Sequence, residues 1–297
     1  MRLPPPLPFL RLLPLLPRLP LLALLTLPLS GCELTEVTVS AGQPVVVVQA
    51  VLSARGTEQF VIVERSLTGS AQVGPTGEDI PPGEPRLPIV GATVVLSHEG
   101  PSSCTPATDT LAAQAPGSGV YVTTAFCPLS AGDRVRLRVV TPDGTVVSGT
   151  TTVPGARAVS VRLATDSATA EEQVLDLDRL RDTIRIGVDP VLARALQVEI
   201  RRRDAPDTIE VYLFTDTLGV ALPGDLYNPF EGDSGKPVFE VGREYILAVA
   251  VTDSNYYDFV RSRSDPFTGR GFLNRLDGGI GVFGSVATYR YYLRVVR

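Results

Sequence analysis

The run Arg134-Val135-Arg136-Leu137-Arg138-Val139 alternates basic and apolar residues along its whole length. Successive side chains of a β-strand point to opposite faces, so this alternation predicts a strand with one face buried and the other in water. Thr141-Pro142-Asp143-Gly144 follows, where proline fixes φ and glycine accepts a positive φ, as a tight turn requires. Residues 145–152 then predict the second strand of a hairpin. We expect a β fold that extends outward from this hairpin.

The segments on both sides of the hairpin also have strand composition. Apolar, β-branched or alternating stretches predict further strands at 45–52, 59–64, 91–96, 119–123, 159–163, 184–188, 196–200, 209–213, 245–251 and 289–296. Residues 67–88 are rich in Gly and Pro and predict a long exposed loop, whereas 167–180 fits either a short helix or an acidic loop. The fold class expected is therefore mostly β.

The domain organisation expected has a boundary at Val153-Pro154-Gly155. Residues 44–155 are predicted to form an immunoglobulin- or transthyretin-like β-sandwich. Residues 156–297 are predicted to form a second β-rich domain with long loops. A chain of 297 residues is long enough for two such cores.

The N-terminal segment has the features of an export signal. Leu29-Ser30-Gly31-Cys32 matches the lipobox at which bacterial lipoprotein precursors are cleaved, and it directly follows the apolar run 19–29. Arg2, Arg11 and Arg18 precede that run, and no acidic residue does. The alternatives are a plain cleaved signal and a transmembrane anchor, but prolines interrupt the leucine-rich span and it falls short of about 20 apolar residues.

Cleavage at the lipobox would remove residues 1–31 and leave Cys32 as a lipidated N-terminus, followed by a tether over 32–43. Acyl chains such as palmitate contribute about 0.8 kcal/mol for each buried CH₂, so several chains on Cys32 would anchor the protein durably. The localisation expected is the cell envelope, as a lipoprotein of the outer membrane, with the membrane itself as the first partner.

Charge and cysteine content narrow the function classes. The net charge is −5, and removal of the three arginines in residues 1–31 lowers it to −8, which argues against nucleic acid as a partner. Beyond Cys32, only Cys104 and Cys127 remain, and an even number in an oxidising compartment predicts a disulfide between them rather than two free thiols. With one histidine and no CxxC pair, neither a metal site nor a cofactor is expected.

Two resemblances follow from the motifs. Val90-Gly91-Ala92-Thr93-Val94, Gly119-Val120-Tyr121 and Ala131-Gly132-Asp133 resemble the transthyretin-like or carboxypeptidase-regulatory-like sandwich modules of bacterial surface proteins. The resemblance covers about residues 44–155, and it implies a spacer or docking module rather than a catalyst.

The C-terminal part resembles a lipoprotein family of unknown function from Bacteroidota and related bacteria. The resemblance is carried by Asn255-Tyr256-Tyr257-Asp258-Phe259, Asp265-Pro266-Phe267-Thr268-Gly269 and Leu276-Asp277-Gly278-Gly279-Ile280-Gly281-Val282-Phe283-Gly284. Genes of that family often neighbour TonB-dependent receptors, which implies an accessory role in uptake with such a receptor, or another envelope protein, as partner. In physical terms, we expect the glycines of the third motif to permit tight turns and its apolar residues to fill a core.

One motif favours an enzyme. Gly232-Asp233-Ser234-Gly235 resembles the nucleophile loop of chymotrypsin-like serine proteases, and the single histidine, His98, lies upstream as that family requires. However, His98 lacks the family's sequence context, and Lys236 replaces the second glycine after the serine. We therefore expect no catalysis, with Ser234 in an ordinary loop and His98 in a solvated one.

Most Tyr and Phe residues follow residue 211, and several fall in expected loops. The candidate ligand surface predicted from them comprises Tyr227, Phe230, Tyr256, Tyr257 and Phe267. The alternative is that these rings pack as a second core. Two function classes follow: an accessory or binding lipoprotein with an exposed aromatic surface, or a structural or adhesive envelope protein in which the rings are buried.

Overall fold

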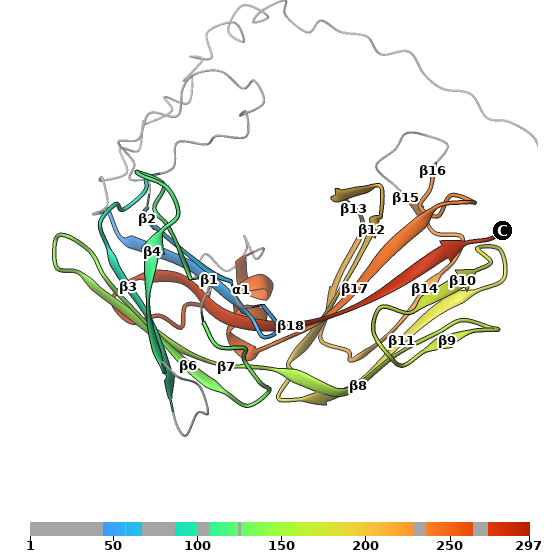
Figure 1. Ribbon diagram of the computed structural model, residues 1–297, viewed down its shortest axis with the longest axis horizontal. Coiled ribbons are helices and arrows are strands. Elements are labelled where there is room, and N and C mark those ends of the chain that lie inside the picture. The colour runs from blue at the N-terminus through green and yellow to red at the C-terminus, as the bar shows by residue number, and fades with distance from the viewer. Residues whose placement is uncertain are drawn as a thin grey trace, which may run out of the picture. The chain divides into compact units, whose positions relative to one another are not determined.

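The computed structural model describes residues 44–56, 58–66, 87–99, 107–123, 126–228, 236–263 and 273–297. This part of the chain is mostly β, with one helix, α1 (Ser254–Arg263) (Figure 1). No helix within it has the length and apolar character needed to cross a membrane.

Most strands belong to one mixed sheet. Its order is β13 (Ala205–Thr215), β12 (Ala195–Arg202), β17 (Glu244–Thr252), β18 (Ile280–Val295), β1 (Val46–Ser53), β2 (Gln59–Arg65), β5 (Val120–Thr123), β4 (Thr108–Ala113), β3 (Thr93–Glu99), β6 (Arg134–Val140) and β7 (Val146–Thr152), and β10 (Val174–Leu177) pairs with β18 outside this path. A second sheet has the order β14 (Gly219–Pro223), β11 (Thr183–Val191), β8 (Gly155–Arg162) and β9 (Ser167–Ala168), and β15 (Tyr227–Asn228) pairs with β16 (Lys236–Pro237).

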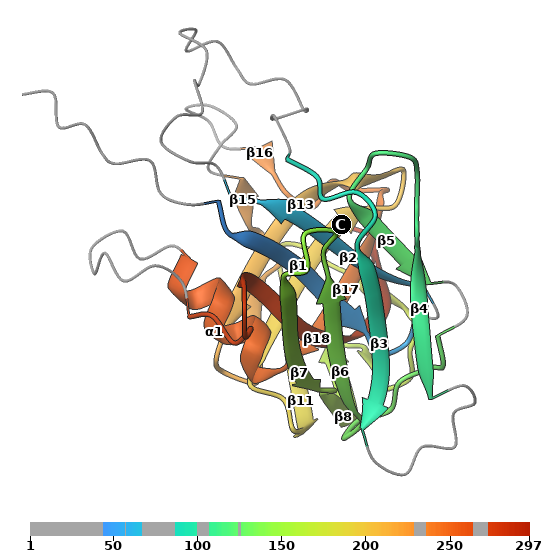
Figure 2. The same cartoon turned by 90° about the vertical axis from the view of Figure 1, so that its left-hand side faces the viewer.

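The hairpin expected from the alternating run is confirmed. Val135, Leu137 and Val139 are fully buried on β6, while Arg134 and Arg136 project outward. Both arginines form ion pairs with Glu99 on the neighbouring β3. β6 pairs antiparallel with β7 through the turn at 141–144. Figure 2 shows β3, β6 and β7 side by side.

The long strand β18 joins the two halves of the sequence. Its residues 280–286 pair parallel with β1, and its residues 286–294 pair antiparallel with β17. Only the part from Tyr289 onward was expected to be a strand, so β18 begins nine residues earlier than predicted. The expected boundary near residue 155 stays a prediction. β18 pairs with β1, which precedes this position in the sequence, and with β17, which follows it.

The second sheet packs against the C-terminal half of β18. Val161 on β8 and Ile186 on β11 share one buried cluster with Tyr291 and Leu293 on β18. The hydroxyl of Tyr291 donates a hydrogen bond to the carbonyl of Val159 at 3.1 Å. A buried aromatic ring whose hydroxyl has a partner adds apolar area without an unsatisfied polar group.

Several local expectations are wrong. Residues 167–180 contain the short strands β9 and β10 rather than a helix or only a loop. β10 is a strand because it pairs with residues 292–295 of β18. Tyr256, Tyr257 and Phe259 lie on α1 rather than in loops. His98 lies on β3 and stacks on Phe126 at 5.0 Å, so it is not a solvated loop residue. Of the expected loop 67–88, only residues 87 and 88 are within the described part.

Candidate functional site

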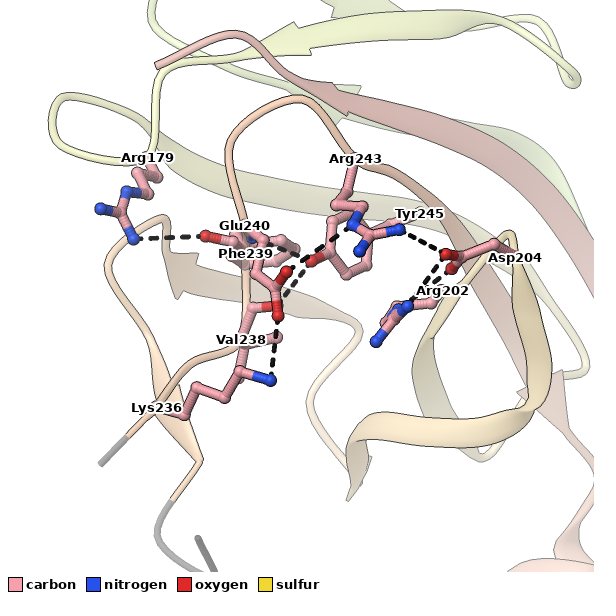
Figure 3. Close-up of polar contacts among 9 residues, drawn as sticks. All are labelled: Arg179, Arg202, Asp204, Lys236, Val238, Phe239, Glu240, Arg243 and Tyr245. Carbon is pink, nitrogen blue, oxygen red and sulfur yellow. Dashed lines mark hydrogen bonds and ion pairs between the residues drawn. The ribbon is translucent and has the colours of Figure 1, made fainter. Parts of the chain in front are cut away.

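A group of alternating charges lies at the end of β12, on β16 and in the turn before β17 (Figure 3). We call Arg202, Asp204, Lys236, Glu240 and Arg243 the charged rim. Arg202 donates two hydrogen bonds to Asp204, at 3.0 and 2.9 Å, and Arg243 donates one to the same carboxylate at 2.6 Å. Glu240 lies between Arg243 and Lys236, with N–O distances of 3.6 and 3.1 Å. Acid and base therefore alternate along the whole rim.

The turn before β17 is hydrogen-bonded to a buried tyrosine. Tyr245 is fully buried, and its hydroxyl donates to the carbonyl of Val238 at 2.8 Å and accepts from the backbone N–H of Glu240 at 2.9 Å. Its ring meets Phe239 edge-on at 5.2 Å, and Arg179 donates to the carbonyl of Phe239 at 3.4 Å. Burial raises the pKa of Tyr245. This anchor fixes the backbone that carries Glu240.

Hydrogen bonds within the rim favour the charged form of each group. Arg202 lowers the pKa of Asp204, and Asp204 in turn raises the pKa of Arg202. Lys236 lowers the pKa of Glu240. All of these side chains are reached by water, so their ion pairs contribute little to stability. They fix the charge pattern of the surface instead.

A cavity of about 200 Å³ opens between the rim and β13. Its lining comprises Arg202, Thr208, Ile209, Glu210, Lys236, Pro237, Val238 and Glu240. Among these, Glu210 is a half-buried carboxylate for which the described residues supply neither a hydrogen bond nor an ion pair. It was not predicted as a site residue, because an isolated glutamate in an alternating strand carries no sequence signal.

The residues of the expected protease-like motif are described only in part. Nε2 of His98 is buried, and no described residue forms a hydrogen bond with it. Ser234 lies outside the described residues. Among the residues that the structure describes, no group of three or more His, Cys, Asp or Glu could hold a metal ion.

The structure separates the predicted aromatic surface. Tyr227 is 57% exposed on β15, whereas Tyr256 and Tyr257 lie on α1. Tyr257 is buried and so does not belong to an exposed surface. Phe230 and Phe267 lie outside the described residues.

Tyr257 instead organises the packing of α1 against β13. Its ring stacks with Phe214 at 6.1 Å, and the guanidinium of Arg194 lies 4.3 Å from the ring centroid. Tyr256 meets the same phenylalanine edge-on at 6.2 Å. These contacts are the kind that hold a helix on a sheet. The packing alternative therefore describes Tyr257, and Tyr227 is the exposed ring among the three predicted residues that the structure describes.

The structure describes one of the three cysteines, Cys127. Cys127 is disulfide-bonded. Cys104 and Cys32 lie outside the described residues, so the pairing with Cys104 and the lipidation of Cys32 stay predictions.

The motif around Asn255 belongs to a buried polar junction. Asp253, 4% exposed, caps α1 by accepting from the N–H of Tyr256 at 2.9 Å, and its other oxygen accepts from the hydroxyl of Thr151 at 2.6 Å. The hydroxyls of Thr151 and Ser285 are 2.8 Å apart. Asn255 donates to the carbonyls of Thr150 and Phe283, at 2.7 and 2.8 Å. The junction thus ties α1 to β7 and β18.

The glycines of the third motif permit close approach. Gly281 has φ +129°, and a Cβ there would collide with the carbonyl oxygen of Val48 on β1. A Cβ on Gly284 would lie 2.8 Å from Cβ of Tyr256 on α1. Both residues lie within β18, so they do not form the tight turns expected, although Gly278, with φ +78°, does precede the strand in a turn-like conformation. The motif residues therefore pack β1, β18 and α1 together.

The comparison with known proteins agrees with the position of these motifs. No curated protein matches the chain. A family model described as a domain of unknown function (DUF4249) matches residues 33–291, which include all residues of the junction and of the charged rim. The chain belongs to this family.

Proposed function

We propose that the protein is a lipid-anchored accessory protein of the bacterial cell envelope that acts through contact with a partner. The observation that carries the proposal is the position of the lipobox. Cys32 directly precedes residue 33, where the family match begins. Cleavage before Cys32 would therefore release the whole family domain with a lipid at its first residue and no further linker to remove.

The cysteine chemistry supports export. Cys127 is disulfide-bonded, and disulfides form and persist in oxidising compartments such as the periplasm and the cell surface. The acidic charge of the exported part would disfavour binding to nucleic acid and to anionic lipid headgroups. The attachment would then depend on the acyl chains, and the folded part would stay available to other proteins.

The arrangement of charge supports contact rather than catalysis. The charged rim presents both signs on a rigid turn, and it borders a cavity that keeps one carboxylate, Glu210, unpaired. Such fixed patterns give specificity to protein contacts. The partner we propose is a TonB-dependent outer-membrane receptor, for which the protein would assist uptake. The proposal rests on the motif resemblance given above and on this surface.

The anchor is tested by metabolic labelling with an alkyne analogue of palmitate. We expect the wild-type protein to incorporate the label and to sediment with the outer membrane. The Cys32→Ser variant should lose the label and the membrane attachment, whereas Cys127→Ser should keep both. A wild-type protein that stays unlabelled and soluble would contradict the proposal.

The absence of catalysis is tested separately with a fluorophosphonate probe. We expect it to leave Ser234 unmodified, because the only histidine of the chain is packed on Phe126 within a strand. Labelling that is lost in both Ser234→Ala and His98→Ala would favour the serine protease instead.

A further inference from the structure

The strand β6 presents a row of arginines on the outer face of the large sheet. Arg134, Arg136 and Arg138 alternate with fully buried residues, and all three are exposed. We call these three residues the arginine row. Alternate residues of an antiparallel strand lie about 6.8 Å apart on one face. Figure 2 shows β4, β3, β6 and β7 side by side toward the viewer, so the row lies within this group of strands rather than at its edge.

A row of hydroxyl side chains on β7 runs beside the arginines. Each arginine lies opposite one hydroxyl residue in the antiparallel pairing: Arg134 opposite Thr152, Arg136 opposite Thr150 and Arg138 opposite Ser148. Side chains that lie directly opposite each other on one face have Cβ atoms about 4.5–5.5 Å apart. Guanidinium groups and hydroxyls both donate hydrogen bonds to anionic oxygens. The two strands therefore present matched rows of donors.

The charge of this face is opposite to that of the chain. On the outward positions of β4, β3, β6 and β7, which alternate with the buried ones, Glu99 is the one acid. At the β7 edge, Asp277 bridges to Ser148 and limits the basic surface on that side. Three arginines against one glutamate leave the face basic, whereas the chain as a whole carries a net charge of −5.

The arginine row keeps donors for a ligand. Glu99 contacts Nε of both Arg134 and Arg136. Each guanidinium has five N–H donors, so one shared carboxylate leaves donors on both. Arg138 has neither an ion pair nor a hydrogen bond from its side chain within the described part of the chain. The row can therefore accept further carboxylates without losing its contacts with Glu99.

Spacing and charge select the occupant. Every second residue of an extended chain recurs at about 6.6–6.8 Å, which is the interval between the arginines. An extended segment with an acid at every second position would thus present its carboxylates in register with the guanidinium groups, which bind carboxylates through two parallel hydrogen bonds. A second copy of this face would instead bring arginine against arginine, and like charges repel.

We propose that the arginine row binds an extended acidic segment of a partner protein, with carboxylates at alternate positions against Arg134, Arg136 and Arg138. The segment would lie over the face of the sheet, so binding uses side chains and needs no open backbone group. The inference deepens the proposed function and rests on it, because it names a surface through which the anchored protein would contact its partner.

The test uses the acylated lipoprotein in a non-ionic detergent and fluorescent peptides of about nine residues, a usual strand length. Each peptide contains threonines and either three glutamates at alternate positions, three glutamates in one block, or three glutamines at alternate positions. In fluorescence anisotropy at low salt, we expect the alternating glutamate peptide to bind at least about threefold more tightly than the block peptide, since an extended block points its middle side chain away. The glutamine peptide should not bind.

Charge reversal at Arg138 tests the position of the site. Arg138→Glu should weaken binding of the alternating glutamate peptide at least about tenfold, and the milder Arg138→Gln should weaken it less. A peptide with lysine in place of its first or last glutamate should regain affinity for Arg138→Glu. The matched control Arg162→Glu reverses the charge of an exposed arginine on β8 of the second sheet, and it should bind as the wild type does. Circular dichroism should show the same fold for all variants.

Several results would overturn the inference. These are absence of binding, equal binding of the alternating and block peptides, and binding that Arg138→Glu leaves unchanged. Tighter binding of inorganic polyphosphate than of the alternating peptide would assign the row to a general polyanion instead. A peptide-independent dimer that Arg138→Glu disperses would assign it to a second copy of the chain.

The outcome is separable from that of the anchor. Loss of peptide binding by a correctly acylated protein would contradict the role of the arginine row alone. Peptide binding by a protein that carries no lipid at Cys32 would contradict the proposed anchoring alone.

Discussion

The hydroxyl of Thr151 on β7 donates a 2.6 Å hydrogen bond to the carboxylate of Asp253, which caps α1 more than 100 residues later in the chain. Asp253 is buried, and Ser285 on β18 completes the junction. A buried polar group that loses its partner retains its desolvation penalty. Removal of one hydrogen-bonding atom from this junction should therefore weaken the packing of α1.

The first prediction concerns the pH dependence of that junction. Burial raises the pKa of Asp253 above its ordinary 3.8. The folded state therefore takes up a proton at higher pH than the unfolded chain, so this contribution to stability is fully present below the ordinary pKa and is lost as pH rises through the folded pKa. We expect the free energy of unfolding of the wild type, relative to Asp253→Asn, to be larger at about pH 4, near the ordinary pKa, than at pH 7. Urea unfolding at both pH values checks this. An unchanged or opposite difference would be inconsistent with a buried carboxylate.

The second prediction concerns the close approach of β18 and β1. Gly281→Ala introduces a Cβ at positive φ that collides with the backbone of Val48. The matched control is Gly144→Ala, where φ is +85° and no atom lies within 4 Å. The control should lose about 1 kcal/mol of unfolding free energy, from the left-handed conformation alone. Gly281→Ala should lose at least about 3 kcal/mol, because backbone must also move. Equal losses in thermal or chemical unfolding would contradict the collision.

The third prediction concerns Tyr245, the buried tyrosine whose hydroxyl holds the backbone of the charged rim. Tyr245→Phe leaves the N–H of Glu240 and the carbonyl of Val238 without their buried partner. We expect a loss of about 1–3 kcal/mol in urea unfolding. Hydrogen exchange at the amide of Glu240 should accelerate as well. Tyr227→Phe is the matched control, since Tyr227 is exposed, and it should change neither quantity. An unchanged exchange rate of the Glu240 amide in Tyr245→Phe would argue against this role of Tyr245.

The fourth prediction concerns alkaline pH. Burial raises the pKa of Tyr291 from 10.0 to about 12. The unfolded chain therefore releases this proton before the folded protein does, and the stabilisation present below pH 10 is lost as pH rises toward 12. Between these values, the wild type should lose up to about 1.4 kcal/mol per pH unit relative to Tyr291→Phe. Parallel pH profiles of the two proteins in chemical unfolding would refute the burial of an ionisable hydroxyl.

The sequence predicts local structure well where periodicity is strong. β6 follows from the alternation of residues 134–139, and β17 from an apolar run whose residues are buried or half-buried on both faces. β10 does not follow from its own residues, because its pairing depends on β18, more than 100 residues away in the chain. The early start of β18 is hidden by Gly281 and Gly284, which are poor strand formers alone but allow β1 and α1 to approach.

The candidate site was only partly predictable for the same reason. Helix α1 carries aromatic residues that resemble loop or strand composition, and the available signal was Asp253 as a cap three residues before Tyr256. The charged rim brings Arg202 and Asp204 together with residues 236–243, which no local pattern connects. Glu210 becomes notable only when the cavity shows that its neighbours are already paired.

In the mechanism that we propose, export ends at Cys32 and leaves a lipid on its sulfur. Mass spectrometry of the N-terminal peptide from the membrane-extracted protein tests it most directly. We expect a peptide that begins at Cys32 and carries diacylglycerol on Sγ and an acyl group on the amine. A peptide that begins at Met1, or one that begins at residue 32 or later without any lipid, would contradict it.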